Sequence, residues 1–154
     1  MDDERFTMVP IGHVTSTRSQ PEDDNWDSET SSITLTDAFG DEALAGLDTF
    51  SHAVVVYVFD RASWDPAKQS RHPRGNTAWP RVGIFAQRAK DRPNRIGVST
   101  CRIVAVEGRT VRVAGLDAID GTPVLDIKPH MVEFGPRGDT VQPAWADELM
   151  RGYF

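Results

Sequence analysis

Cationic side chains gather in one short stretch of this sequence, residues 83–97, which reads GIFAQRAKDRPNRIG. Four cations fall within eight positions of it: Arg88, Lys90, Arg92 and Arg95. A solvated face normally mixes both signs of charge, so a cluster of one sign indicates an anionic ligand. A guanidinium can hold a carboxylate through two parallel hydrogen bonds. This stretch is therefore the first candidate site.

A second dense polar segment covers residues 115–130 and reads GLDAIDGTPVLDIKPH. The period of a strand places Asp126 and Lys128 on one face, with Leu125 and Ile127 on the other. One interpretation of the first pair is a surface ion pair, worth at most about 1 kcal/mol. The other is an acid and a base that project together into a site.

Several kinds of site find no support in the sequence. The four histidines show no zinc-binding spacing with one another or with Cys101, the only cysteine. We therefore expect no metal. The sequence also has no GxSxG, no P-loop and no GxGxxG. Cys101 lies in the apolar stretch VSTCRIVAV, which favours a buried hydrophobic role over a nucleophilic one.

Charge is distributed unevenly along the 154 residues, whose formal net charge is -6. Residues 20–48 contain nine acidic residues and no Lys or Arg, whereas residues 68–95 contain eight basic residues and one acid, Asp91. The longest apolar run, residues 53–59, is too short to cross a bilayer, and the N-terminus is acidic where a secretion signal is basic. We expect one cytoplasmic domain over residues 1–154, with no membrane contact.

Strand patterns dominate the chain. Apolar or β-branched segments bounded by turn residues begin near residues 8, 31, 52, 98, 110 and 123. The turn at residues 107–109 predicts a hairpin, and Asp120-Gly121 predicts a second turn, so we expect a meander over the last three strands. Short helices are expected at DEALAGL and in the tail, where Pro143 suits a first helical position. The fold class is mainly β: a single antiparallel β-barrel or strongly curled sheet with short helices.

The same motifs resemble a known family. IGHV, DDNW, GLDTFSHAVVVYVF, RVGIFAQRAKDRPNRIGVS and GLDAIDGTPVLDIKP occur in an order similar to that of the TrmO, or YaeB/TsaA, methyltransferases. The resemblance spans residues 11–128. It implies a small β-barrel that forms a homodimer, binds S-adenosyl-L-methionine and methylates N6 of threonylcarbamoyladenosine beside the tRNA anticodon.

The resemblance also implies site residues. The cofactor pocket would be lined by Phe85, Ala86, Arg88, Val98, Leu116, Asp117, Ile119 and Asp120, with Asn25, Trp26, Asp60 and Arg61 as further candidates. An arginine would hold the cofactor's carboxylate, and Asp117 or Asp120 would accept hydrogen bonds from its ribose. Asp126 is the candidate base that removes a proton from N6. The substrate would be held by Arg71, Arg74, Arg81, Arg92, Arg95 and Lys128.

Three functions stay open from the sequence. The first is the tRNA methyltransferase, with the anticodon stem-loop as its partner. The second is a methyltransferase on the same scaffold that acts on a small-molecule acceptor. The third is a non-catalytic barrel that binds RNA or a nucleotide, for which the chain offers few exposed aromatic residues outside Trp64 and Trp79.

Overall fold

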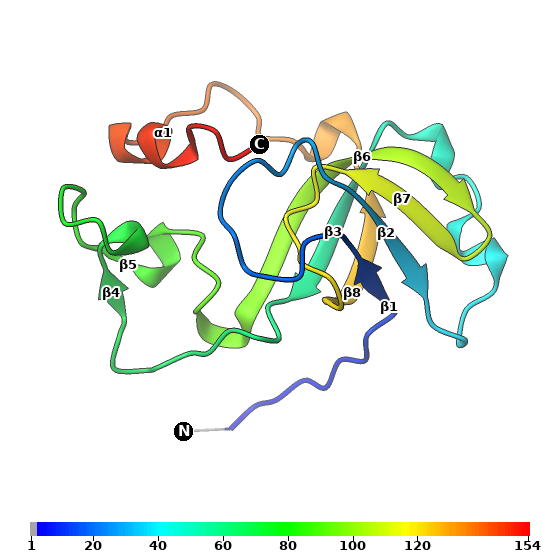
Figure 1. The fold of residues 1–154 in the computed structure, drawn as a ribbon, viewed down its shortest axis with the longest axis horizontal. Helices are drawn as coiled ribbons and strands as arrows, with labels where there is room; N and C mark the ends of the chain where they lie inside the picture. Colours follow the sequence, from blue (N-terminus) through cyan, green and yellow to red (C-terminus); the bar gives the residue numbers. More distant parts are fainter. Residues whose placement is uncertain (1–2) are drawn as a thin grey trace.

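The computed structural model describes residues 3–154, and a closed six-stranded β-barrel forms its centre (Figure 1). The strand order is β1-β2-β7-β6-β3-β8, and each neighbouring pair is antiparallel. The strands are β1 (Gly12–Thr15), β2 (Thr30–Leu35), β3 (His52–Val58), β6 (Ile96–Glu107), β7 (Thr110–Ala114) and β8 (Pro123–Pro129). The predicted mainly-β antiparallel barrel is confirmed.

Alternation along the strands builds the core. In β3 the side chains of Ala53, Val55 and Tyr57 are buried, whereas Val54 and Val56 lie on the outer face and are half-buried. The equivalent inward positions of the other strands carry small and branched apolar residues that fill the interior. Closure leaves these six strands without a free edge, which a curled sheet would have kept.

The predicted turns exist, but the predicted meander is wrong. Residues 107–110 connect β6 to β7 as a hairpin, with Gly108 at a φ of 61°, and Gly121 supports the second turn at a φ of 84°. However, β8 pairs with β1 and β3 and not with β7. The segment between β7 and β8 therefore crosses one end of the barrel, and β8 closes the cylinder.

Short helices and one small sheet complete the chain. The two-stranded sheet is β4 (Ser70–Arg71) with β5 (Val82–Gly83), and α1 spans Ala144–Met150. The 3-10 helices are η1 (Asp41–Leu44), η2 (Leu47–Thr49), η3 (Pro73–Gly75), η4 (Ile84–Ala86), η5 (Pro93–Arg95) and η6 (Val132–Phe134). The helix expected at DEALAGL is thus two 3-10 turns, because Gly46 takes a left-handed φ of 88° between them. Pro143, the expected first helical residue, is instead the N-cap, and α1 begins one position later at Ala144.

The arrangement gathers three long connections at one end of the barrel. Strands β1, β3 and β7 end there and β2, β6 and β8 begin there, so residues 16–29, 59–95 and 115–122 converge. Figure 1 shows the segment with β4 and β5 standing to one side of the barrel, near α1. Trp79 donates its indole N–H to Glu148 of α1 over 2.7 Å, which ties these two parts together. No helix among residues 3–154 is long and apolar enough to span a membrane.

Candidate functional site

A single carboxylate organises the open end of the barrel. Asp117 follows β7, and its Oδ1 accepts hydrogen bonds from the Tyr57 hydroxyl, at 3.0 Å, and from the Ser99 hydroxyl. Its Oδ2 accepts from the hydroxyl of Tyr153, beyond α1. Four segments far apart in the chain therefore meet at one side chain.

The three donors are neutral. Burial, with the nearby negative charge of Asp117, raises the pKa of Tyr57 and of Tyr153 well above the usual range of a tyrosine. Both hydroxyls therefore keep their protons and donate. None of the ion pairs found within residues 3–154 includes Asp117. Among the described residues, the contacts of this carboxylate are therefore hydroxyl groups and not cations.

Arg88 carries the opposite charge and is anchored on the residue before Ser99, which is one of the donors to this carboxylate. Its Nη2 donates to the carbonyl of Val98 over 2.6 Å, which anchors the side chain on β6. Among the influences on the Tyr153 pKa, burial and Asp117 raise it, whereas the charge of Arg88 lowers it, so both charged groups act on the same ring. Arg88 is exposed, and a guanidinium has five N–H donors, so it can still bind an anion.

An open cleft of about 620 Å³ lies in the same long connection. Phe85 and Ala86 line it together with Trp64, Gln69 and Pro93, and Phe85 is 80% exposed. The volume falls within the range of small-molecule sites. Arg88 and Asp117 are not part of its lining, so the predicted cofactor residues divide between this cleft and the carboxylate cluster.

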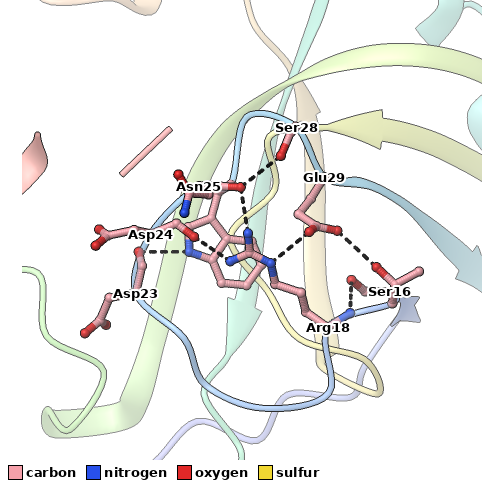
Figure 2. A network of polar contacts seen from close by, with 9 residues as sticks. Ser16, Arg18, Asp23, Asp24, Asn25, Ser28 and Glu29 are labelled. Carbon is pink, nitrogen blue, oxygen red and sulfur yellow. Dashed lines mark hydrogen bonds and ion pairs between the residues drawn. The ribbon is translucent and has the colours of Figure 1, made fainter. Parts of the chain in front are cut away.

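The DDNW segment forms a loop fixed by Arg18 (Figure 2). The Arg18 guanidinium donates to the carbonyls of Asp24 and Asn25, at 2.7 and 2.6 Å, and to the Glu29 carboxylate at 2.9 Å. It also lies 4.2 Å from the centroid of the Trp26 ring. Trp26 is 3% exposed, so its indole stabilises the loop and offers no free face to a ligand. The exposed Asn25 has a left-handed φ of 66°.

Other predicted cofactor residues serve the connection between β7 and β8. Leu116 is a core residue, 1% exposed. The carbonyl of Ile119 accepts from the Thr122 hydroxyl at 2.7 Å, and Asp120 Oδ1 accepts from the Ser16 amide at 3.0 Å. Asp120 thus links the connection between β7 and β8 to the connection between β1 and β2, which contains the DDNW segment. Asp117 differs from Asp120 in accepting hydrogen bonds from three hydroxyl groups.

The remaining arginines chiefly bind backbone carbonyls of the long connection. Arg95 donates to Asp60 and Ala62, each at 3.2 Å, and Arg92 donates to Gln87 at 2.8 Å. Arg61 reaches across to Ser19 at 2.7 Å. Carbonyl partners fix these guanidinium groups without neutralising them. The unusual density of cations in residues 83–97 therefore has a structural use as well as an electrostatic one.

The predicted substrate arginines of the long loop differ from one another. Arg71 donates to the Asp91 carbonyl at 3.5 Å, and Arg81 donates to the Ser70 carbonyl at 3.1 Å. Arg74 instead forms ion pairs with the carboxylates of Asp23, at 3.8 Å, and Asp24, at 3.2 Å. The acidic and basic parts of the chain therefore meet directly at Arg74, whose charge is partly compensated.

Asp126 lies on the outer face of the barrel. It pairs in register with Val56, which in turn pairs with Val98, so these three residues form one outward-facing row. Two strand spacings separate Asp126 from Val98, or about 10 Å. The predicted ion pair exists: Lys128 Nζ lies 2.8 Å from Asp126 Oδ2. Asp126 also lines a second hollow, mostly apolar, at the η1 and η2 end.

Sequence reasoning missed Tyr57, Ser99, Tyr153 and Arg18. Tyr57 gave one signal, a hydroxyl within a strand buried on both faces, which needs a partner. The residues next to Ser99, Tyr153 and Arg18 in the sequence gave no signal that would have indicated a role in the site. Cys101 is buried as expected, and burial together with Asp117 raises its pKa to about 12. Within residues 3–154 no group of three or more His, Cys, Asp or Glu is placed to hold a metal ion.

The fold defines a small antiparallel β-barrel domain, and the candidate site at one end of it offers a guanidinium, a carboxylate and exposed aromatic surface. Residues 13–135 match the family described as the tRNA-methyltransferase O N-terminal domain. The chain belongs to this family.

Individual relatives span different lengths. A probable S-adenosyl-L-methionine-binding protein of Methanothermobacter thermautotrophicus is 37% identical over 143 residues, covering 90% of this chain and 99% of that protein. The human tRNA (adenine(37)-N6)-methyltransferase is 36% identical over 104 residues, which are 67% of this chain and 23% of that protein. The crystal structure of TrmO from Pseudomonas aeruginosa matches with a TM-score of 0.72 and 30% identity over 90% of this chain and 62% of that one. The chain thus spans a quarter to two thirds of the length of the longer relatives.

Proposed function

We propose that this chain is an S-adenosyl-L-methionine-dependent methyltransferase domain acting on N6 of threonylcarbamoyladenosine next to the tRNA anticodon. The observation that carries the proposal is the anchoring of Arg88 on the carbonyl of Val98, directly before Ser99, which donates to Asp117, while Phe85 lines a cleft in the same connection as Arg88. Family membership and the names of the relatives support it.

The donor set of the site fits this cofactor. Arg88 has free N–H donors for a carboxylate, and Asp117 has acceptor capacity for a ribose hydroxyl. Phe85 and the backbone of η4 offer an apolar surface and polar groups for an adenine. When bound, the cofactor supplies a methyl group already activated by its sulfonium. The protein's task is then largely positioning, which can contribute several kcal/mol.

The acceptor must lose a proton from N6, and we propose Asp126 as the group that takes it. Asp126 shares the outer row with Val98, the residue whose carbonyl anchors Arg88. Lys128, two positions further along β8, forms an ion pair with this carboxylate. The cofactor and the acceptor would accordingly meet over the outer face of β3. The homodimer implied by the family would cover the same half-buried face, so a second subunit would border the site.

A small-molecule acceptor is the second candidate, and one observation favours it. Arg74, one of the cations assigned to RNA phosphates, is already engaged by two carboxylates. A polyanion would have to break these ion pairs to use it. The name of the archaeal relative mentions cofactor binding alone.

Two measurements test the proposal. Calorimetry with S-adenosyl-L-methionine should show an affinity loss of about 1.5 to 3 kcal/mol for Arg88→Ala, the range of hydrogen bonds to charged groups. Lys90→Ala, a neighbouring cation, is the matched control. Unchanged affinity would remove Arg88 from the site. Mass spectrometry of tRNA nucleosides from a deletion strain should show loss of the N6-methyl group, and a normal nucleoside profile would exclude the tRNA acceptor.

A further inference from the structure

Tyr153 is the donor to Asp117 that comes from outside the barrel strands. Its hydroxyl donates to Oδ2 of Asp117, and the charge of Arg88 acts on the same ring. Tyr57 and Ser99 hold the other oxygen, Oδ1, from inside the barrel. Tyr153 is therefore the donor that fixes the outward oxygen of this carboxylate.

The segment that carries Tyr153 is built into the fold. The amide of Asn25 donates to the Gly152 carbonyl at 3.0 Å, and the amide of Trp26 donates to the Tyr153 carbonyl at 2.8 Å. The Tyr153 amide donates back to Met150 at 3.0 Å. Because Trp26 is buried, removal of the segment would leave its backbone N–H without this acceptor, which is unfavourable. These backbone hydrogen bonds therefore favour the state in which Tyr153 is packed against the DDNW loop.

Counting acceptor positions shows what remains for a ligand. An ionised carboxylate has about four lone-pair positions, and three hydroxyls occupy three of them here. One acceptor position of Asp117 remains, with its direction fixed by the three donors. Such an oxygen suits one hydroxyl of a ligand.

We propose that Tyr153 is a positioning residue for cofactor recognition, which orients Asp117 so that its last acceptor position takes one ribose hydroxyl. This inference rests on the proposed cofactor. It adds Tyr153, which lies beyond the part of the chain that matches the family, to the binding site. Tyr153 and the DDNW loop would then form one wall of the pocket.

The test compares Tyr153→Phe, which keeps the ring, with the wild-type protein in binding three ligands. These are S-adenosylhomocysteine and its 2′-deoxy and 3′-deoxy counterparts, measured by calorimetry. Tyr153→Phe should bind the ribose ligand about 5- to 10-fold more weakly, because one charge-assisted bond of Asp117 is lost. For the deoxy ligand that lacks the recognised hydroxyl, wild type and variant should bind equally.

Phe154→Leu is the matched control, since Phe154 is exposed and contacts Tyr153 only through its ring edge. It should leave all three affinities unchanged. An equal loss for all three ligands in Tyr153→Phe would indicate a merely structural role and would overturn the inference. So would unchanged affinity for S-adenosylhomocysteine. If the wild-type protein binds none of the ligands, the proposed function fails together with the inference.

Hydrogen exchange supplies a second readout. The amides of Asn25 and Trp26 report directly on the segment, because its carbonyls accept from them. Their exchange should slow when S-adenosylhomocysteine binds. Faster exchange on binding would show that the segment leaves the pocket, which would contradict a positioning role for Tyr153.

Discussion

At the scale of single residues, Gly97 explains how a core tyrosine reaches a ligand site. A Cβ at this position would lie 2.5 Å from Cε2 of Tyr57 and 2.9 Å from Cζ of Phe59. The absent side chain lets the Tyr57 ring lie against β6 and extend its hydroxyl to Asp117. The glycine of the RIG motif is thus required by packing and not by backbone conformation.

We expect Gly97→Ala to lower the free energy of unfolding by about 1 to 3 kcal/mol, as overpacked cores do. Cofactor affinity should fall as well, because the Tyr57 ring must move away from Asp117. Denaturant unfolding and calorimetry measure the two effects. Gly40→Ala is the control, since a Cβ there meets nothing within 4 Å. Wild-type behaviour of Gly97→Ala would refute the packing role.

At the scale of elements, the connection between β1 and β2 depends on one fork of hydrogen bonds. Arg18 joins the start of this connection to its middle, through Asp24 and Asn25, and to its end, through Glu29 (Figure 2). The Arg18 guanidinium beside Glu29 holds the pKa of that carboxyl below its usual value of 4.5. A lysine could not make these three contacts at once. The shape of the connection therefore depends on the several N–H donors of a guanidinium and not on its positive charge alone.

This pKa shift predicts a pH-dependent stability difference for Glu29→Gln. A carboxyl with a lowered folded-state pKa stabilises the protein above the unfolded-state pKa and loses that contribution as pH falls through the folded value. At pH 7 the variant should be less stable than wild type by up to about 1 kcal/mol, since the pair is partly exposed. The stability difference between the variant and wild type should disappear as the pH falls below 4.5. Thermal unfolding across pH measures it, with Glu107→Gln as the control; a gap that persists in acid would contradict the linkage.

At the scale of the whole molecule, positive charge concentrates in the connection between β3 and β6. The net charge is -6, yet this connection, residues 59–95, holds nine of the seventeen cations. Most of these side chains contact neutral backbone carbonyls, which do not compensate their charge. Arg74 instead forms ion pairs with carboxylates. We therefore expect RNA binding, where it occurs, to use this connection and to be moderate in strength.

Replacement of Arg71, Arg74 and Arg81 by glutamine should weaken binding of an anticodon stem-loop and flatten its salt dependence. The expected change is about 0.7 to 0.9 log units per phosphate contact, for two contacts instead of three because Arg74 is already paired. Cofactor affinity should stay the same. Fluorescence titrations across salt concentrations measure this, with Arg109→Gln at the opposite end of the barrel as the control. Absence of salt-dependent binding by the wild-type protein would eliminate the tRNA acceptor.

Local patterns in the sequence determined much of this architecture. The alternation in residues 52–58, the glycine turns at Gly108 and Gly121 and the limits of β8 follow from side-chain period and turn chemistry, which neighbouring residues fix. The cation cluster marked the connection that forms the open end. Arg88 and Asp117 as site residues are instead what the resemblance to the family implies.

Tertiary structure alone decided how these parts combine. Pairing of β8 with β1 and β3 depends on closing a cylinder, which no single turn encodes, so the sequence suggested a meander instead. The hydroxyls around Asp117 come from residues 57, 99 and 153, and hydrogen bonds across such separations leave no periodic signal. Likewise, the buried amide of Trp26 needs an acceptor, and the fold provides it from Tyr153, more than a hundred positions away.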